Sequence, residues 1–232
     1  YHIEQGSEPI EFKVRSNEIA KEPNPYPETF NDRTFLSQRL PLTAFFGRPP
    51  EAKDKPFLIC LTVEDCQVCA AQKKEWKESP PAGVHFQFIS ESKLVLTDPE
   101  KLQIIQLTYD HFFDISERNI PTPISFLIDQ KNRLSAIYRG HIDQNLLLED
   151  CKNINISGSE LRSRSVPFSG PWASKQISSA RPLNFVEDLL DAGLLDPAAN
   201  YINKEMNSLK EDELFPMLLK RLEALKLDRI TP

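Results

Sequence analysis

Hydrophobic and polar residues alternate in the middle of the chain in the pattern of strands separated by helices. The unbroken apolar run 57–61 is typical of a buried strand, and residues 84–89 alternate like a second strand. A third apolar run ends at Asp129 and is followed, after a polar turn, by the alternating segment 134–140. Helical spacing is expected after the first strand and within residues 99–114. This order of elements predicts an α/β fold.

Helical periodicity dominates the last part of the chain. One helix is predicted with an apolar face made of Phe185, Val186, Leu189 and Leu190. Gly193 is expected to end it, and Asp196 and Pro197 are expected to start the next helix as N-cap and first residue. A last helix is predicted from leucines at helical spacing, Leu214, Leu218, Leu222 and Leu225. These helices either dock on the α/β domain and stabilise it or form an arm that docks a partner.

The remaining segments are expected to be irregular. The first 39 residues hold one candidate strand, 10–14, and a proline-rich stretch, 22–27, which is expected to be extended. Serine, glycine and proline are frequent in residues 157–171, which predicts a linker. The predicted organisation is an N-terminal extension (1–39), an α/β domain (40–152), a linker (153–181) and a helical C-terminal region (182–232).

The candidate chemistry lies at Cys66 and Cys69, which are separated by two residues between the first predicted strand and a predicted helix. The N-terminus of a helix carries unpaired N–H groups and a partial positive charge, so a thiolate placed there is stabilised. A second thiol close by can release a trapped mixed disulfide. We therefore expect a redox-active pair in which Cys66 attacks and Cys69 resolves.

Two other interpretations of the CxxC pair are open. A CxxC pair can supply half of the ligands of a structural zinc site. Such a site needs four ligands, and the chain has no second CxxC and no paired histidines. The pair is also compatible with an inert structural disulfide. We expect no metal and no other cofactor. Cys60 lies inside the first strand and is expected to behave as a small buried hydrophobe, and Cys151 is not expected to take part in the chemistry.

A second motif supports a family resemblance. Prolines 121 and 123 lead into the strand that ends at Asp129, and the final strand ends at Gly140. Together with the CxxC motif, this pattern makes residues from about 40 to 149 resemble the thioredoxin-like superfamily, and most closely its extracytoplasmic thiol–disulfide oxidoreductase branch. The resemblance implies a mixed sheet flanked by helices and a short closing helix at 144–152.

The resemblance also implies a substrate-binding loop. In that family the proline six residues before the aspartate is preceded by a cis peptide bond and faces the CxxC motif; by position this is Pro123, with Thr122 before it. Thr122 and Pro123 would then present backbone groups to a substrate strand. The alternative is a rigid turn with trans peptide bonds.

The chain departs from the family pattern beside the cysteines. Asp65, preceded by Glu64, stands where the family has a tryptophan, and Cys60 stands where thioredoxin has a buried aspartate. Negative charge on the two acids disfavours a thiolate, whereas the helix N-terminus favours it. Both acids are expected to cap the helix start and to face water.

Composition narrows the class of function. The 232 residues are 40% hydrophobic and 27% charged, enough for a full domain with extensions. The net charge of −6 argues against a nucleic-acid-binding protein, which would carry an excess of basic residues. No apolar run is long enough to span a membrane.

The sequence thus predicts a thiol–disulfide oxidoreductase that acts on cysteines of protein substrates and uses an unidentified redox partner. The resemblance implies a periplasmic or other extracytoplasmic location. The alternative is a non-catalytic thioredoxin-like binding module that keeps Cys66–Cys69 as a structural bond and docks partners through its helical C-terminal region. A third, weaker hypothesis is the handling of Cu(I) by the two thiolates.

Overall fold

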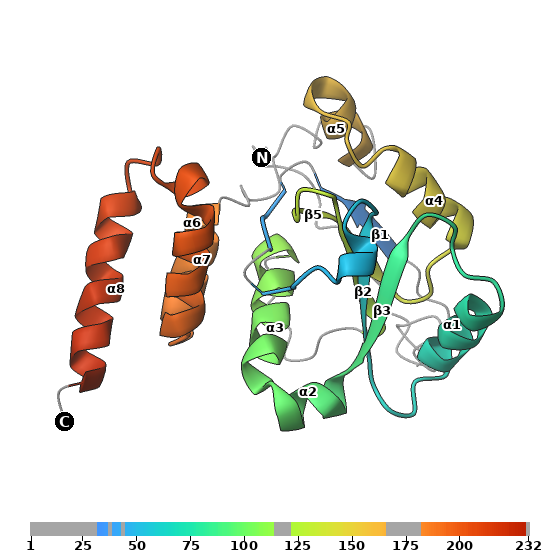
Figure 1. Cartoon of the computed structure of the whole chain (residues 1–232), viewed down its shortest axis with the longest axis horizontal. Coiled ribbons are helices and arrows are strands. Elements are labelled where there is room, and N and C mark those ends of the chain that lie inside the picture. The colour runs from blue at the N-terminus through green and yellow to red at the C-terminus, as the bar shows by residue number, and fades with distance from the viewer. Residues whose placement is uncertain (1–31, 37–38, 43–44, 114–121, 166–181, 231–232) are drawn as a thin grey trace, which may run out of the picture.

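The computed structural model describes residues 32–36, 39–42, 45–113, 122–165 and 182–230. The candidate strand at 10–14 and the proline-rich stretch at 22–27 lie outside these residues. The described part contains a mixed sheet with helices on both faces and three further helices at one side (Figure 1).

Five strands form the sheet. They are β1 (Asp32–Phe35), β2 (Phe57–Thr62), β3 (His85–Ser90), β4 (Ile124–Ile128) and β5 (Leu134–Arg139). Their order is β1-β5-β4-β2-β3; β2 and β3 are parallel, and the other pairs are antiparallel. The four strands predicted from apolar runs are confirmed. The edge strand β1 lies within the predicted N-terminal extension.

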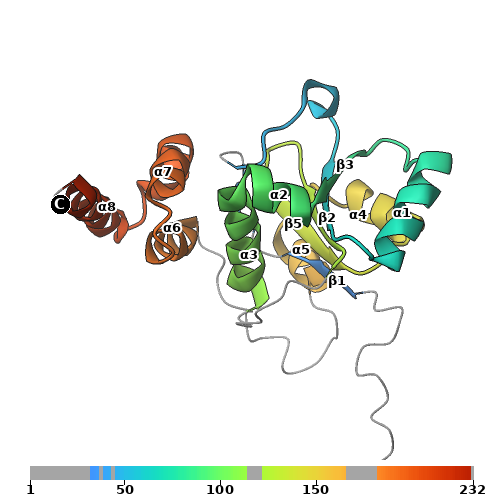
Figure 2. The same ribbon diagram turned by 90° about the horizontal axis from the view of Figure 1, so that it is seen from below.

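Helices cover the sheet in two layers. The elements are the 3-10 turn η1 (Pro50–Ala52) and the helices α1 (Gln67–Glu78), α2 (Glu91–Thr97), α3 (Pro99–Phe113), α4 (Gln144–Lys152) and α5 (Gly158–Ser165). Seen from below, α2 and α3 lie on one side of the sheet and α1 and α4 on the other (Figure 2). The closing helix predicted at 144–152 is α4. The short helix α5 lies within the predicted linker.

Strand β2 is apolar throughout because both of its faces are buried. Its alternate side chains point to opposite sides: Leu58 and Cys60 pack with Trp76 of α1, whereas Phe57 and Ile59 belong to the core under α3. A strand covered by helices on both faces needs a continuous apolar run, which explains why β2 carried the clearest strand signal.

The C-terminal helices are α6 (Pro182–Asp191), α7 (Leu195–Leu209) and α8 (Phe215–Ile230). Helix α6 packs against α3, and α7 and α8 pack on α6 and on each other (Figure 1). The ring of Phe45 stacks on Tyr201 of α7 with centroids 5.4 Å apart and meets Phe185 of α6 edge-on at 6.0 Å. The side chain of His111 in α3 also bonds Asp188 of α6, with Nδ1 and Oδ2 2.6 Å apart. Of the two fates considered for these helices, docking on the α/β domain is therefore the one observed for α6 and α7.

Gly193 ends α6 as predicted. Its backbone is left-handed (φ 74°), its N–H donates to the Leu190 carbonyl at 3.0 Å, and the N–H of Leu194 donates to the Leu189 carbonyl at 2.9 Å. This pair of bonds is the Schellman motif, which favours glycine at its left-handed position. The prediction of Asp196 as the next N-cap is wrong: Leu194 holds that position, and Asp196 lies in the first turn of α7. The chain enters α7 directly from the Gly193 turn, so the helix begins early.

We predict that Gly193→Ala destabilises the protein by about 1–2 kcal/mol, because a residue with a Cβ is disfavoured in the left-handed region. No atom lies within 4 Å of the position of the added Cβ, so the cost is conformational and not steric. Urea unfolding measures it. Gly47→Ala is the matched control, since Gly47 has the same open surroundings without a left-handed φ. Equal stability of the two variants would contradict the assignment.

Candidate functional site

The two cysteines lie where β2 leads into α1. Strand β2 ends at Thr62, a short loop follows, and α1 begins at Gln67 with Cys66 as its N-cap. The loop makes a sharp turn at Asp65, whose backbone is left-handed (φ 60°). The strand, turn, CxxC and helix predicted from the sequence are therefore present in that order.

Cys66 and Cys69 are joined by a disulfide and differ in exposure. Cys66 is half-buried, whereas Cys69 is only 2% exposed. The N–H of Cys69 donates to the Sγ of Cys66 at 3.0 Å, so the cysteine itself caps the helix with its sulfur. The first cysteine of the motif is therefore more accessible than the second.

The loop at Thr122–Pro123 reaches the same edge of the sheet. Strand β4 runs antiparallel to β2 with Leu61 opposite Ile124, so the residues just before β4 arrive beside the end of β2. The peptide bond between Thr122 and Pro123 is cis. The carbonyl of Pro123 accepts the N–H of Gly140 at 2.8 Å, which fixes the loop against the end of β5. The fold thus brings all four residues singled out from the sequence to one edge.

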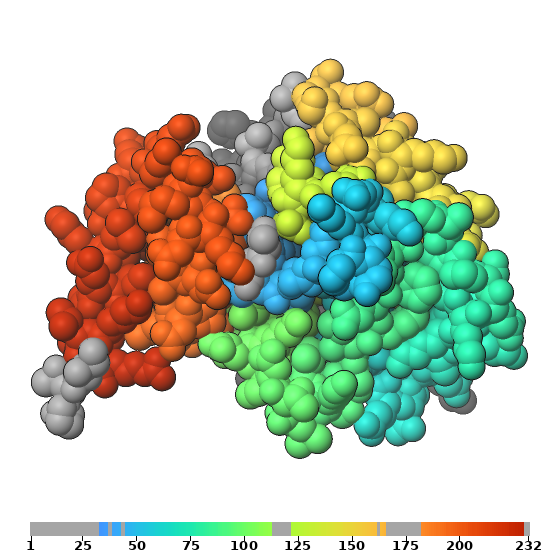
Figure 3. Space-filling model, in the orientation of Figure 1, coloured from blue at the N-terminus to red at the C-terminus, as the bar shows by residue number. Residues whose placement is uncertain are grey.

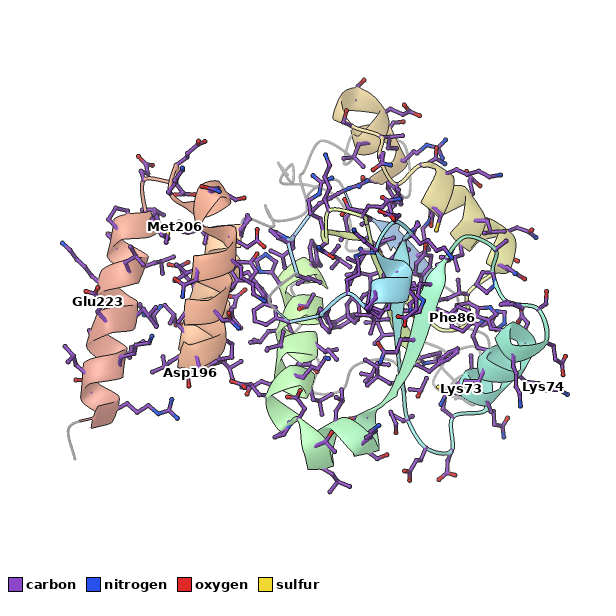
Figure 4. All side chains as sticks on the ribbon, viewed as in Figure 1. Lys73, Lys74, Phe86, Asp196, Met206 and Glu223 are labelled. Carbon is purple, nitrogen blue, oxygen red and sulfur yellow. A yellow bond between two sulfur atoms is a disulfide. The ribbon has the colours of Figure 1, made fainter. Side chains whose placement is uncertain are left out.

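An open hollow of about 480 Å³ lies at the cysteines. It is lined by Val63, Asp65, Cys66, Gln67, Cys69, Ala70 and Lys73. The carboxylate of Asp65 and the ammonium of Lys73 give it one charge of each sign. The Lys73 ammonium also lies 5.7 Å from the ring centroid of Phe88 in β3, and Figure 4 labels Lys73 on α1.

The acids before the motif have different surroundings. Asp65 and Glu64 are both exposed, as expected, but neither caps α1, because Cys66 does. Glu64 instead accepts a hydrogen bond from the hydroxyl of Ser92 at 2.7 Å. This bond joins the loop before the cysteines to the first turn of α2.

A buried glutamine holds α1 in place. Gln72 is 3% exposed, and its Oε1 accepts the N–H of Ile142 at 2.6 Å while its Nε2 donates to the Ile142 carbonyl at 3.4 Å. One turn away, Glu75 Oε2 lies 2.8 Å from Nε2 of His141. The helix that carries Cys69 is therefore fastened to the loop between β5 and α4.

The other two cysteines are free thiols, of which Cys60 is buried and Cys151 half-buried. Cys60 is 1% exposed, and burial raises the pKa of its thiol to about 12, against the smaller opposing effects of a hydrogen bond with Ser125 and the charge of Lys73. Burial, reinforced by the charge of Asp150, likewise raises the pKa of Cys151 to about 12. Both thiols remain protonated near neutral pH, so neither supplies a nucleophile.

Buried polar groups elsewhere are structural. Asp150 of α4 accepts two hydrogen bonds from Arg33 of β1, at 3.0 and 2.5 Å, and one from the Tyr138 hydroxyl at 2.8 Å. Burial raises the pKa of Asp150, while these partners oppose the shift. Asp129 accepts the backbone N–H groups of Lys131 and Arg133 at 2.9 Å and so shapes the turn between β4 and β5. These groups join strands and helices away from the cysteines.

The described ranges hold neither a candidate metal site nor a candidate membrane span. No three side chains of His, Cys, Asp and Glu gather there in an arrangement that could hold a metal ion. Over the same residues, no helix combines the length and the apolarity that crossing a membrane requires.

Sequence reasoning missed three side chains of the site: Gln72, Lys73 and Ser92. The first two follow Cys69 by three and four residues, which places them on its side of the helix, so the helical spacing could have indicated them. No sequence signal indicates the contact of Ser92 with Glu64, because it depends on the pairing of β2 with β3.

The chain has a thioredoxin-like fold. This assignment rests on the mixed sheet with helices on both faces and on the CxxC motif at the start of α1. No family model matches the chain, and no curated protein matches it.

Two solved structures are similar to parts of it. A DsbF homologue from Corynebacterium diphtheriae is 13% identical with a TM-score of 0.30, and the match covers 54% of this chain and 85% of that one. StoA from Bacillus subtilis is 16% identical with a TM-score of 0.27, and the match covers 42% and 82%.

We predict that Cys60 of this thioredoxin-like fold resists alkylation. In the native, reduced protein at about pH 8, iodoacetamide should modify Cys66 and leave Cys60 untouched, because a buried thiol with a high pKa is neither accessible nor ionised. Mass spectrometry of the peptides gives the occupancy of each cysteine. The same reaction in urea is the control and should modify all four. Equal modification of Cys60 and Cys66 in the native protein would contradict the prediction.

We also predict that Gln72→Leu lowers the free energy of unfolding by about 1–3 kcal/mol, because it leaves the buried N–H of Ile142 without a partner. Gln103→Leu is the matched control, an exposed glutamine in α3. Urea unfolding of both variants measures the difference. A Gln72→Leu protein as stable as the control would rule out the anchoring role.

Proposed function

We propose that the protein exchanges the Cys66–Cys69 disulfide with thiols of protein substrates. One observation carries this proposal: the sulfur of the half-buried Cys66 accepts the N–H of Cys69 at the start of a helix, and Cys69 itself is buried. A helix N-terminus and a hydrogen bond both favour the thiolate over the thiol. The first sulfur is therefore the one prepared to attack or to be attacked.

The exchange needs only sulfur chemistry. In the reducing direction, the Cys66 thiolate attacks one sulfur of a substrate disulfide, and the other substrate sulfur leaves as a thiolate. Cys69, once deprotonated, then attacks the Cys66 sulfur of the mixed disulfide, closes the Cys66–Cys69 bond and releases the second substrate thiolate. Two electrons pass from the protein to the substrate, and the two protons of the dithiol are balanced by the two substrate thiolates. The reverse sequence oxidises a substrate dithiol.

The charges around the motif have opposite effects on the stability of the Cys66 thiolate. The negative charge of Asp65 disfavours a thiolate at Cys66, whereas the positive charge of Lys73, on the wall of the same hollow, favours it. The direction of transfer in the cell follows from the potential of the pair against that of its compartment and its redox partner.

The loop at Thr122–Pro123 is proposed to hold the substrate. Pro123 has no N–H and its carbonyl already accepts from Gly140, so the backbone of Thr122 is the part of this loop left to pair with an extended substrate. Addition of a strand to a free backbone edge is a general mode of peptide recognition. A substrate held this way runs beside Cys66.

We further propose an extracytoplasmic location and a separate redox partner. Disulfides persist in oxidising compartments outside the cytoplasm, where a CxxC protein needs another protein to restore its working redox state. No cofactor is required, because the two sulfurs carry both electrons.

We predict that reduced Cys69→Ala protein, incubated with insulin, accumulates a mixed disulfide through Cys66, because the second thiol that would release the substrate is gone. Cys66→Ala should form no such adduct, and Cys151→Ala, the matched control, should reduce insulin at the wild-type rate. Non-reducing gels with and without dithiothreitol measure the adduct. Absence of the adduct, while Cys66 still reacts with small thiol reagents, would favour the non-catalytic binding module over the oxidoreductase.

A further inference from the structure

Two apolar side chains of α2 are exposed at the edge of the sheet that carries the cysteines. Val95 is 53% exposed and Leu96 is 84% exposed, the highest value among the large hydrophobic residues that the structure describes as exposed. The others, Leu214, Met217 and Leu227, lie on α8 or immediately before it. Only the pair on α2 is connected to the CxxC loop.

That connection is the hydrogen bond from Ser92 to Glu64, which lies two residues before Cys66. Residues three and four positions after Ser92 lie on the same side of a helix, with Cβ atoms about 5–6 Å from one turn to the next. Val95 and Leu96 are those residues. They therefore continue, one turn further along α2, the side of the helix that contacts the CxxC loop.

The register of the sheet and the space-filling view both place α2 beside the CxxC loop. Strand β3 is parallel to β2, with Ser90 opposite Thr62, so α2 starts at the same edge of the sheet as the CxxC loop. In the space-filling view, the green residues of α2 and the blue-green residues leading into α1 lie together along the lower edge of the molecule (Figure 3). We name the surface formed by Val95 and Leu96 the α2 patch.

The α2 patch is held in a fixed position without serving the core. Leu94 turns inward and is 6% exposed, in the core between the sheet and α3. The hydroxyls of Ser90 and Ser92 lie 2.8 Å apart at the start of the helix. The neighbours of Leu94 on the outer side thus face solvent, and exposed apolar side chains grouped beside a reactive site mark an interaction surface.

The strip between the α2 patch and Cys66 is acidic. Glu64 and Asp65 are both exposed and occupy the loop that a bound polypeptide would cross. A chain that runs from Cys66 to the patch passes two carboxylates, so a basic residue at that point is favoured and an acidic one is disfavoured.

We propose that the α2 patch docks the substrate polypeptide: an apolar residue near the reactive cysteine packs on Val95 and Leu96, and a basic residue between them lies over Glu64 and Asp65. This inference rests on the proposed function, because a substrate sulfur bonded to Cys66 forces the neighbouring residues over this surface. A small disulfide such as oxidised glutathione has no apolar side chain to place on the patch. The α2 patch therefore selects polypeptides.

The test uses two cysteine peptides, each supplied as a mixed disulfide with a coloured aromatic thiol. In the first peptide, the cysteine is flanked on both sides by lysine and then leucine; in the second, serine replaces the leucines. The reduced protein attacks the peptide sulfur through Cys66 and expels the coloured thiolate, and Cys69 then releases the peptide thiol. Release of colour gives the rate constant, and the disulfide of the aromatic thiol alone is the small-molecule comparison.

Wild-type protein should react about five- to tenfold faster with the leucine peptide than with the serine peptide, the factor expected when two apolar side chains are partly buried. A Val95→Ser, Leu96→Ser double variant should lose this preference while reacting normally with the small disulfide. Met217→Ser is the matched control and should keep the preference, because Met217 is an exposed hydrophobic residue of α8, away from the α2 patch. Replacing the peptide's lysines by glutamates should slow the wild-type reaction, and added salt should reduce that difference.

A preference that survives in the double variant would overturn the docking proposal and leave the oxidoreductase intact. Equal slowing of the peptides and the small disulfide would also overturn it, because the variant would then have changed the cysteines themselves. A wild-type protein that reacts with none of the three disulfides would refute the proposed function, and the α2 patch would fall with it.

Discussion

The pairing of β2 on both sides decides where the reactive residues lie. Because β2 is parallel to β3 and antiparallel to β4, its last residues meet the end of one neighbour and the start of the other. The CxxC loop, the Thr122–Pro123 loop and the start of α2 all follow from that arrangement. The burial of β2 on both faces makes the pairing stable, since a shift by one residue would exchange the side chains under α1 for those under α3.

The two faces of the sheet are covered by different helices. On one face, α1 and α4 cover the core that supports the cysteines, where Trp76 of α1 packs with Cys60 of β2. On the other face, α3 lies between the sheet and α6, where His111 bonds Asp188 and the Phe45 and Tyr201 rings stack. The C-terminal helices thus enlarge the core on the side opposite the CxxC helix, and they leave the edge with the cysteines open.

Much of this arrangement could be predicted from the sequence. Strands with continuous or alternating apolar residues were found, and the spacing of Cys66 and Cys69 identified the start of α1. The placement of Pro123 came from the family resemblance and not from periodicity. Strand β1 was missed because Asp32 and Arg33 give no apolar pattern, and it exists through its pairing with β5. The contacts of Gln72 and Ser92 join segments far apart in the chain, which local patterns do not record.

The bonds of Gln72 have a consequence for how the parts of the site are positioned. Gln72 holds both polar groups of the Ile142 backbone, and Gly140, two residues earlier, holds the carbonyl of Pro123. A short stretch of backbone therefore connects the helix of Cys69 to the loop proposed to bind substrate. The position of that loop relative to the helix of Cys69 is thus set by residues 140–142, none of which belongs to the CxxC motif or to the loop itself.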